Sequence, residues 1–345
     1  MGARHNAFTS KEYTCYWAKL RDADLPLAAE ILSEMLMEPA FRQDEIDSER
    51  HVVLEEINMN EDDPTDVAHE LFVRKLWADH PLSPPILGTR DSITGMSRDT
   101  IAGYWRRRYS PHSIVIAAAG RIDHDELVAQ IGELFGDWEG EKVERTHVPA
   151  LSPQGVAVRT KDTEQAHLVL GTASLQRDDE RRWAGDVVDH VLGSGMSSRL
   201  FREVREQRGL AYAVHSFRMP FVETGANAIY VGTTPTQAPE VLKLIRSELD
   251  KMLASGLTPV ELERAKGHVR GSLALSLEDS NSRMSRLGRN ELTGIEHLSV
   301  EAVIGKIDAV TLDDTVEVAE LMYSGPYVLG AVGPFEADEL ESYVA

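Results

Sequence analysis

The chain has 345 residues, of which 42% are hydrophobic and 6% aromatic, and this length suffices for two domains of ordinary size. The formal net charge of −21 opposes binding to nucleic acid or to an anionic membrane surface, and it favours cationic or neutral substrates by comparison. A single cysteine, Cys15, excludes an intramolecular disulfide, and no apolar run approaches the length of a membrane span. We therefore expect a soluble globular protein in a reducing compartment, with the cytoplasm as its location.

The first half of the chain is predicted to combine short strands with helices. Residues 6–20 are rich in Phe, Thr, Tyr and Trp around a polar break, and they predict a strand, a turn and a second strand. A further strand is predicted over the apolar run 113–119. Helical periodicity and proline or acidic stops predict helices over 26–39, 44–62, 64–76, 100–107 and 125–135. Residues 139–155 are charged and lack periodicity, which predicts a linker.

The second half follows a similar order. Strands are predicted within 156–173 and over 210–217, 226–233 and 327–332. Helices are predicted over 181–192, 198–207 and 239–253, from residue 258 onward, and briefly from residue 338. The helix after residue 258 begins with a capping box, Thr258 followed three residues later by Glu261.

The two halves align with each other when the chain is shifted by about 213 residues, or by about 216 in the helical region. The shift places 114–120 on 327–333 and Pro26 on Pro239. The alignment predicts two copies of one α+β fold, each a mixed, mostly antiparallel sheet packed with helices, over residues 1–138 and 156–345. Because the second copy begins near residue 156, the first is expected to begin about 58 residues before Met1, so we expect an incomplete first domain.

Two carboxylates stand out in the helix predicted over 44–62. Glu49, Val52, Val53 and Glu56 fall at i, i+3, i+4 and i+7, on one stripe of the helix. A carboxylate on an inward stripe is costly unless a cation, a metal or strong donors meet it. The alternative is a solvated acidic face. The second copy has an alanine and a serine at the positions of the two glutamates. Because a purely structural acidic face would often occur in both copies, this difference favours a functional role for the two carboxylates in the first copy.

Several runs carry a resemblance to a known family. They are NAFTSKEYT at 6–14, ERHVVLEE at 49–56, HPL and LGT at 80–82 and 87–89, SRLF at 198–201 and REQRGLAY at 205–212. Together they resemble the pitrilysin or insulinase family of zinc peptidases, with the processing-peptidase branch looking most similar. The likeness covers nearly the full chain, and the combination is specific although each run alone is modest.

The resemblance implies roles for individual residues in the first half. The family's zinc site uses an HxxEH helix, with two histidine ligands and a glutamate as general base, and a second glutamate downstream as third ligand. Glu56 matches that third ligand. Glu49 matches a further acidic residue near the metal, where a carboxylate orients ligands or water, and it is the catalytic candidate of this chain.

The resemblance also implies substrate-binding residues. The strand at Asn6, Ala7 and Phe8 would accept a substrate peptide as an added strand. Arg205 and Tyr212, which lie seven residues apart, match a pair that holds the substrate carbonyl. The predicted partners are therefore a peptide substrate and either a second copy of the chain or a catalytic sister subunit, with no nucleic acid and no membrane.

One departure from the family pattern limits the prediction. Neither HxxEH nor HExxH occurs in the 345 residues. Counting back from Glu56 places the expected histidines about 20 residues before Met1, within the segment that the duplication predicts to be absent. We expect a zinc-dependent endopeptidase that cleaves peptides or presequence-like substrates, in a form that lacks the HxxEH helix and is inactive alone. The alternative is a noncatalytic processing-peptidase-like subunit that binds peptides or a catalytic partner chain.

Overall fold

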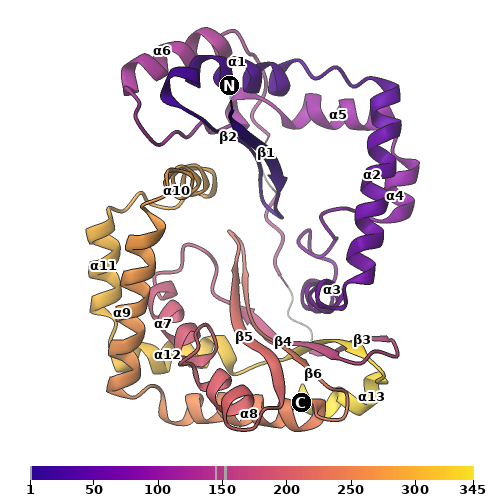
Figure 1. The fold of residues 1–345 in the computed structure, drawn as a ribbon, viewed down its shortest axis with the longest axis vertical. Coiled ribbons are helices and arrows are strands. Elements are labelled where there is room, and N and C mark those ends of the chain that lie inside the picture. The colour runs from indigo at the N-terminus through magenta and orange to yellow at the C-terminus, as the bar shows by residue number, and fades with distance from the viewer. Residues whose placement is uncertain (1, 144–145, 151–153) are drawn as a thin grey trace. The chain divides into compact units, whose positions relative to one another are not determined.

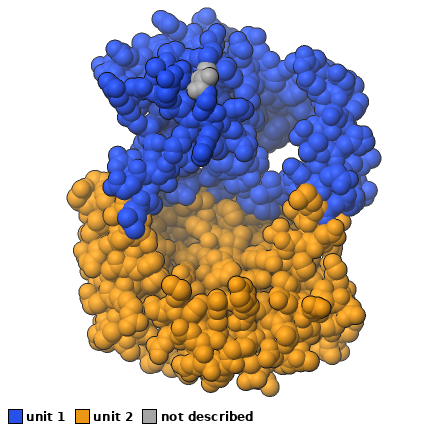
Figure 2. All heavy atoms as spheres, viewed as in Figure 1, with its two compact units in different colours: residues 1–58, 86–146, 275–297 blue, residues 59–85, 147–274, 298–345 orange. Residues whose placement is uncertain are grey.

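The structure is a computed structural model that describes residues 2–143, 146–150 and 154–345 (Figure 1). Packing divides it into two compact units that are discontinuous in sequence (Figure 2). Unit 1 contains residues 1–58, 86–146 and 275–297, and unit 2 contains residues 59–85, 147–274 and 298–345. The domains predicted over 1–138 and 156–345 follow the sequence repeat rather than these units, and they stay a prediction. Residues 144–145 and 151–153 of the predicted linker lie outside the described residues.

Unit 2 is built on a five-stranded sheet. The strand order is β3 (Gly155–Thr160), β7 (Val328–Gly333), β4 (Ala166–Ser174), β6 (Gly225–Thr233) and β5 (Ala211–Pro220). Only β3 and β7 pair in parallel, and the other neighbours are antiparallel. The mixed, mostly antiparallel sheet with surrounding helices confirms the predicted α+β class.

Helices cover both faces of this sheet. On one face α3 (Pro64–Trp77) packs its buried Phe72, Leu76 and Trp77 against a cluster that includes Val169 and Val328. The other face carries α7 (Arg182–Leu192), α8 (Ala238–Ser255) and α12 (Leu312–Tyr323), whose apolar side chains form the larger core. A sheet covered on both faces needs continuous apolar strands rather than alternating ones, and every residue of β6 is buried.

A glycine sets how closely α3 approaches the sheet. A Cβ added at Gly330 of β7 would lie 2.5 Å from the backbone oxygen of Ala68 and 2.6 Å from the backbone nitrogen of Phe72. Any larger residue would therefore push the helix off the strand.

Unit 2 contains three further α-helices. They are α9 (Pro259–Ser276), α11 (Val300–Ala309) and α13 (Ala337–Leu340). The capping box predicted before α9 is present: Glu261 Oε2 accepts from the backbone N–H of Thr258 at 2.8 Å, and Thr258 Oγ1 accepts from the N–H of Glu261 at 3.3 Å.

Unit 1 combines a hairpin with helices. Strands β1 (Arg4–Thr9) and β2 (Thr14–Lys19) pair antiparallel, as the sequence predicts. The helices are α1 (Leu25–Met37), α2 (Gln43–Asp62), α4 (Arg90–Gly95), α5 (Arg98–Arg108), α6 (His124–Phe135) and α10 (Ser280–Thr293). Asp62 ends α2 and Pro64 begins α3, and the side chain of Asp63 between them accepts from the N–H of Thr65 at 2.8 Å.

The strand predicted over 113–119 is wrong for this structure. Residues 114–119 form no strand, and no backbone hydrogen bond joins them to another part of the described chain. An extended segment becomes a strand only through a neighbouring ladder, and this segment has none. Its counterpart in the repeat, β7, pairs with both β3 and β4.

The helix starts confirm the predicted shift between the two halves. Helices α1 and α8 begin 213 residues apart, as do α6 and α13. Helices α2 and α9 begin 216 residues apart, as do α3 and α10. Among the described residues, no helix combines the length and apolar character needed to cross a membrane.

Candidate functional site

Helix α2 carries the two predicted carboxylates on an uncovered face. Glu49 and Glu56 are both exposed, Val52 between them is 48% exposed, and Val53 is half-buried. Two turns of helix separate the carboxylates by about 10 Å. Arg50, on the neighbouring face, donates to the backbone oxygen of Ile93 and so ties α2 to α4. The two glutamates thus stand on one stripe, as predicted.

The residues described here do not by themselves fit a zinc ion. Among them, no group of three or more His, Cys, Asp or Glu side chains could hold a metal. A catalytic zinc site needs three protein ligands, and Glu56 offers one. No catalytic step through a metal follows from these side chains alone.

The predicted peptide-binding strand β1 presents a free edge. It pairs with β2 on one side only, and all six of its residues are exposed. The hydrogen bond from Ser10 N–H to the Tyr13 carbonyl oxygen makes these two residues a hydrogen-bonded pair of the hairpin. Hydrogen-bonded and non-hydrogen-bonded pairs alternate along antiparallel strands, so Ala7 belongs to a non-hydrogen-bonded pair and its backbone groups point away from β2. In agreement, the Ala7 N–H donates to Oδ1 of Asn6 at 2.8 Å. Phe8 lies edge-on to the Tyr13 ring, with 5.9 Å between the centroids.

Arg205 and Tyr212, predicted from the resemblance, are brought together in unit 2. The guanidinium carbon of Arg205 lies 4.9 Å from the ring centroid of Tyr212 and 4.9 Å from that of Phe201. The arginine is therefore held between two aromatic rings, each of which contributes a cation–π attraction. Arg205 belongs to a π-helical segment, Phe201–Glu206, and such segments are frequent at functional sites.

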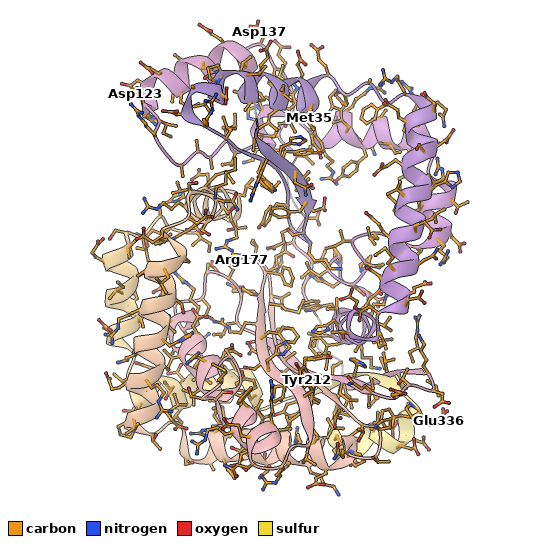
Figure 3. The ribbon with its side chains drawn as sticks, viewed as in Figure 1. Met35, Asp123, Asp137, Arg177, Tyr212 and Glu336 are labelled. Carbon is orange, nitrogen blue, oxygen red and sulfur yellow. The ribbon has the colours of Figure 1, made fainter. Side chains whose placement is uncertain are left out.

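Tyr212 occupies a bulge at the start of β5. The register of β5 against β6 shifts between Ala211 and Ala213, so Tyr212 has no partner residue across the ladder. The side chain of Tyr212 is 79% exposed (Figure 3). Gly209 has φ +63°, a backbone conformation that favours glycine, in the turn between the π-helical segment and the strand.

An ion pair anchors the chain just before this segment. Arg199 donates to both carboxylate oxygens of Glu261 at 2.8 Å and to the backbone oxygen of Gly256 at 2.9 Å. These hydrogen bonds from Arg199, together with those from Thr258, lower the pKa of Glu261 to about 2. The side chains are 16% and 24% exposed, so water screens the pair only in part.

Phe201 was not predicted from the sequence. It lies four residues before Arg205, a spacing that places two side chains on the same face of a helix. The spacing alone was a weak signal, because the same residue also fits an ordinary core position.

Three histidines surround the buried Tyr230 in unit 2. The ring centroids of His69, His167 and His215 lie 5.4, 6.1 and 5.2 Å from that of Tyr230, and His167 Nδ1 is hydrogen-bonded to the tyrosine hydroxyl at 2.9 Å. Burial lowers the pKa of His167, and burial followed by the charge of His69 lowers the pKa of His215. His69 belongs to α3, and His167 and His215 lie on strands β4 and β5 of the sheet that this helix covers.

Comparison with known proteins agrees with this fold and these residues. Residues 1–90 match the family described as Insulinase (Peptidase family M16), and residues 95–268 match the one described as Peptidase M16 inactive domain. The chain belongs to peptidase family M16. The predicted family resemblance is thereby confirmed.

The chain is also similar to named proteins over most of their length. An uncharacterized zinc protease of Streptomyces coelicolor is 41% identical over 361 residues, covering 100% of this chain and 78% of the relative. An uncharacterized zinc protease of Bacillus subtilis is 38% identical over 335 residues, covering 97% of this chain and 81% of the relative.

Solved structures show the same fold at lower identity. A peptidase M16 inactive domain from Pseudomonas fluorescens superposes with a TM-score of 0.90 at 22% identity, over 97% of this chain and 82% of that one. A chain from complex III2 of Candida albicans superposes with a TM-score of 0.87 at 19% identity, over 100% of this chain and 86% of that one. At these identities the likeness concerns the fold.

Proposed function

We propose that this chain binds extended, basic peptides as part of a zinc-dependent endopeptidase that cleaves peptides or presequence-like substrates. The observation that carries the proposal is the guanidinium of Arg205, fixed between Phe201 and the exposed ring of Tyr212. A planar cation held in this way keeps donors available for a peptide carbonyl and loses little conformational entropy on binding.

A second surface supports peptide binding by strand addition. The backbone N–H and carbonyl of Ala7 point out of the hairpin edge, and the side chain of Asn6 caps that N–H. An extended peptide can displace this amide and continue the ladder. The net charge of −21 attracts peptides rich in lysine and arginine.

In this proposal Glu56 is one ligand of the zinc, and Glu49 is the neighbouring carboxylate that orients ligands or water. A bound zinc ion would supply Lewis-acid chemistry for the peptide carbonyl and for water. The names of the Streptomyces and Bacillus relatives support zinc as the metal. Because the described residues lack two further ligands, the 345-residue chain is expected to bind peptides without hydrolysing them.

The experiment that tests peptide binding compares two arginines of the same segment. A fluorescently labelled, unfolded basic peptide is titrated with the wild-type chain, Arg205→Ala and Arg202→Ala, and the dissociation constants are read from anisotropy. Arg202 is exposed and carries the same charge, so it controls for loss of a cation. We expect Arg205→Ala to weaken binding roughly tenfold to a hundredfold, the worth of a hydrogen bond to a charged group, and Arg202→Ala to leave it nearly unchanged. Equal effects of the two substitutions would refute the proposed role of Arg205.

The second candidate is a noncatalytic subunit that binds peptides or a catalytic partner chain. It is favoured by the lack of a three-ligand group among the described side chains and by the match of residues 95–268 to an inactive-domain family. Sequencing the DNA upstream of Met1 separates the two candidates. An in-frame HxxEH about 20 codons before Met1 supports the endopeptidase, and a stop codon directly ahead of Met1 supports the noncatalytic subunit.

A further inference from the structure

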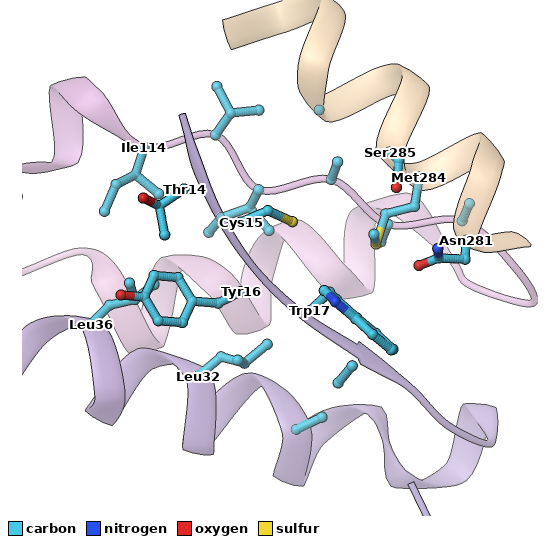
Figure 4. Close-up of a pocket in the computed structure, with 18 of the residues that line it drawn as sticks. Thr14, Cys15, Tyr16, Trp17, Leu32, Leu36, Ile114, Asn281, Met284 and Ser285 are labelled. Carbon is cyan, nitrogen blue, oxygen red and sulfur yellow. The ribbon is translucent and has the colours of Figure 1, made fainter. Parts of the chain in front are cut away.

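Aromatic side chains line a cleft in unit 1 and an open surface in unit 2. The cleft lies beside β2 and has a volume of about 1200 Å³, with Tyr16 and Trp17 among its lining residues (Figure 4). The open surface lies on β5, the strand at one edge of the five-stranded sheet. It adjoins the Arg205–Tyr212 pair, because Tyr212 belongs to the same strand.

Strand β5 is buried on one face and partly open on the other. Its residues Val214 and Ser216 are buried on the side of α7, where the Ser216 hydroxyl donates to the backbone oxygen of Asp189 at 3.0 Å. The side chains that alternate with them point to the opposite face, and none of them is buried: Ala213, His215, Phe217 and Met219. Helix α3 lies over β3, β7 and β4 on this face, which leaves the edge strand less covered.

Four rings on this face form a cluster whose rim is open. The ring centroid of His215 lies 5.2 Å from that of Tyr230 and 6.0 Å from that of Phe217. His69 of α3 completes the cluster, with centroid distances of 5.1 Å to Phe217 and 5.4 Å to Tyr230. Tyr230 is buried, whereas the His215 side chain is exposed. Ring pairs at these separations attract each other, so a further ring placed beside His215 and Phe217 would extend the cluster.

The ring of His215 is available for such a contact. Among the described residues, no side-chain hydrogen bond holds this ring. Its partial burial, and then the charge of His69, lower the pKa of His215, so the ring is neutral at pH 7 and does not repel a basic peptide. Met219 continues the row on the strand, and its thioether suits contact with an aromatic ring.

The spacing along β5 relates this surface to the Arg205 site. His215 and Phe217 lie three and five residues after Tyr212, which is roughly 10 to 17 Å of strand. An extended peptide advances by nearly the same length per residue. When Arg205 holds one carbonyl of such a peptide, a side chain three to five residues away therefore reaches the β5 surface.

We propose that His215, Phe217 and Met219 of β5, together with His69 of α3, form a subsite for one aromatic side chain of the bound peptide. This aromatic subsite depends on the proposed peptide binding at Arg205, since that arginine sets the register of the peptide. An aromatic side chain stacks on rings that are already arranged, and it covers a face that is half open in the free chain. A small side chain would leave this face exposed.

The test compares two fluorescently labelled basic peptides that differ at one residue. Both are lysine–serine peptides, one with a single central phenylalanine and the other with alanine in its place. The repetitive flanks let the peptide slide until the central residue meets the subsite. Dissociation constants are read from anisotropy, and the wild-type chain is expected to bind the phenylalanine peptide about tenfold more tightly than the alanine peptide.

Matched variants assign this preference to residues, with circular dichroism as the check on folding. His215→Ala removes an exposed ring and is expected to lower the preference from about tenfold to about threefold, and Phe217→Leu is expected to act similarly at nearly constant volume. His268→Ala removes an exposed histidine of α9 in the same unit and is expected to keep the preference. Arg205→Ala is expected to weaken binding of both peptides by the same factor and to leave their ratio unchanged.

A photo-crosslinking peptide reports directly where the aromatic side chain lies. In this peptide p-benzoylphenylalanine replaces the phenylalanine, and mass spectrometry identifies the crosslinked residue. The crosslink is expected within residues 213–219 or at His69, and an excess of the phenylalanine peptide is expected to suppress it.

Several results would overturn the aromatic subsite. Equal affinity of the wild type for the two peptides would do so while leaving peptide binding at Arg205 intact. A preference that survives both His215→Ala and Phe217→Leu would have the same meaning, and so would a crosslink confined to residues outside the β5 surface. Binding of neither peptide would refute the proposed function, and the subsite with it.

Discussion

The ion pair between Arg199 and Glu261 stabilises unit 2 at the point from which the Arg205 segment begins. Replacing Glu261 by glutamine keeps the side-chain volume and removes the charge. The pKa of Glu261 falls from an ordinary value of 4.5 to about 2, which corresponds to about 3 kcal/mol of stability. Because a quarter of the side chain is still exposed, we expect Glu261→Gln to lower the free energy of unfolding by about 2 kcal/mol at pH 7.

The difference in unfolding free energy between the wild type and Glu261→Gln should depend on pH. A carboxylate with a lowered pKa stabilises the fold fully above about pH 4.5, and this contribution is lost as the pH falls toward 2. Urea unfolding of the wild type and of Glu261→Gln, followed by circular dichroism from pH 7 downward, should therefore show curves that converge below pH 4.5. Glu180→Gln is the control, since its partner Lys306 and its own carboxylate are both largely exposed, and less than about 1 kcal/mol is expected. A difference that stays constant down to pH 3 would refute the electrostatic explanation.

Two further predictions concern the contact of Phe201 with Arg205 and the buried histidine His190. Phe201→Leu is expected to weaken binding of the basic peptide about two- to fivefold, because the cation–π contact with Arg205 is lost, and Phe201→Tyr is expected to preserve binding. Unchanged peptide binding by Phe201→Leu would show that Phe201 takes no part in the site. Burial, and then the charge of His268, lower the pKa of His190 to about 4, so stability should be complete above about pH 6.5 and fall by about 2 kcal/mol toward pH 4. Unfolding of His190→Asn should lack that decline, and an identical pH profile would refute the assignment.

Helices and strands were predicted correctly where the apolar periodicity and the flanking turn residues indicate the same element. The hairpin, α2 and the strands of unit 2 were found because apolar spacing and turn residues mark them within a short window. Helix α10 was missed because its sequence, SNSRMSRLGRNELT, is polar and it has no buried residue. Helices α4, α11 and α12 were also missed. The shift of 216 residues from α3 would have predicted α10, since a repeat carries information that a local pattern lacks.

The strand over 113–119 failed for a different reason. The sequence SIVIAAA has strand character, but a strand forms only where a neighbour supplies hydrogen bonds, and local composition does not reveal the neighbour. Glu56 and the Arg205–Tyr212 pair were predicted through the family resemblance. The contact between Phe201 and Arg205 became evident only from the three-dimensional arrangement.

The central claim is that this chain binds peptide and does not hydrolyse it alone. The most direct measurement incubates the purified 345-residue protein with an unfolded basic peptide, with and without added zinc, while calorimetry records binding and mass spectrometry records the peptide's integrity. We predict saturable binding and an intact peptide under both conditions, because the described residues include no three-ligand metal group. Cleavage that a chelator suppresses would contradict the claim, and so would the absence of binding.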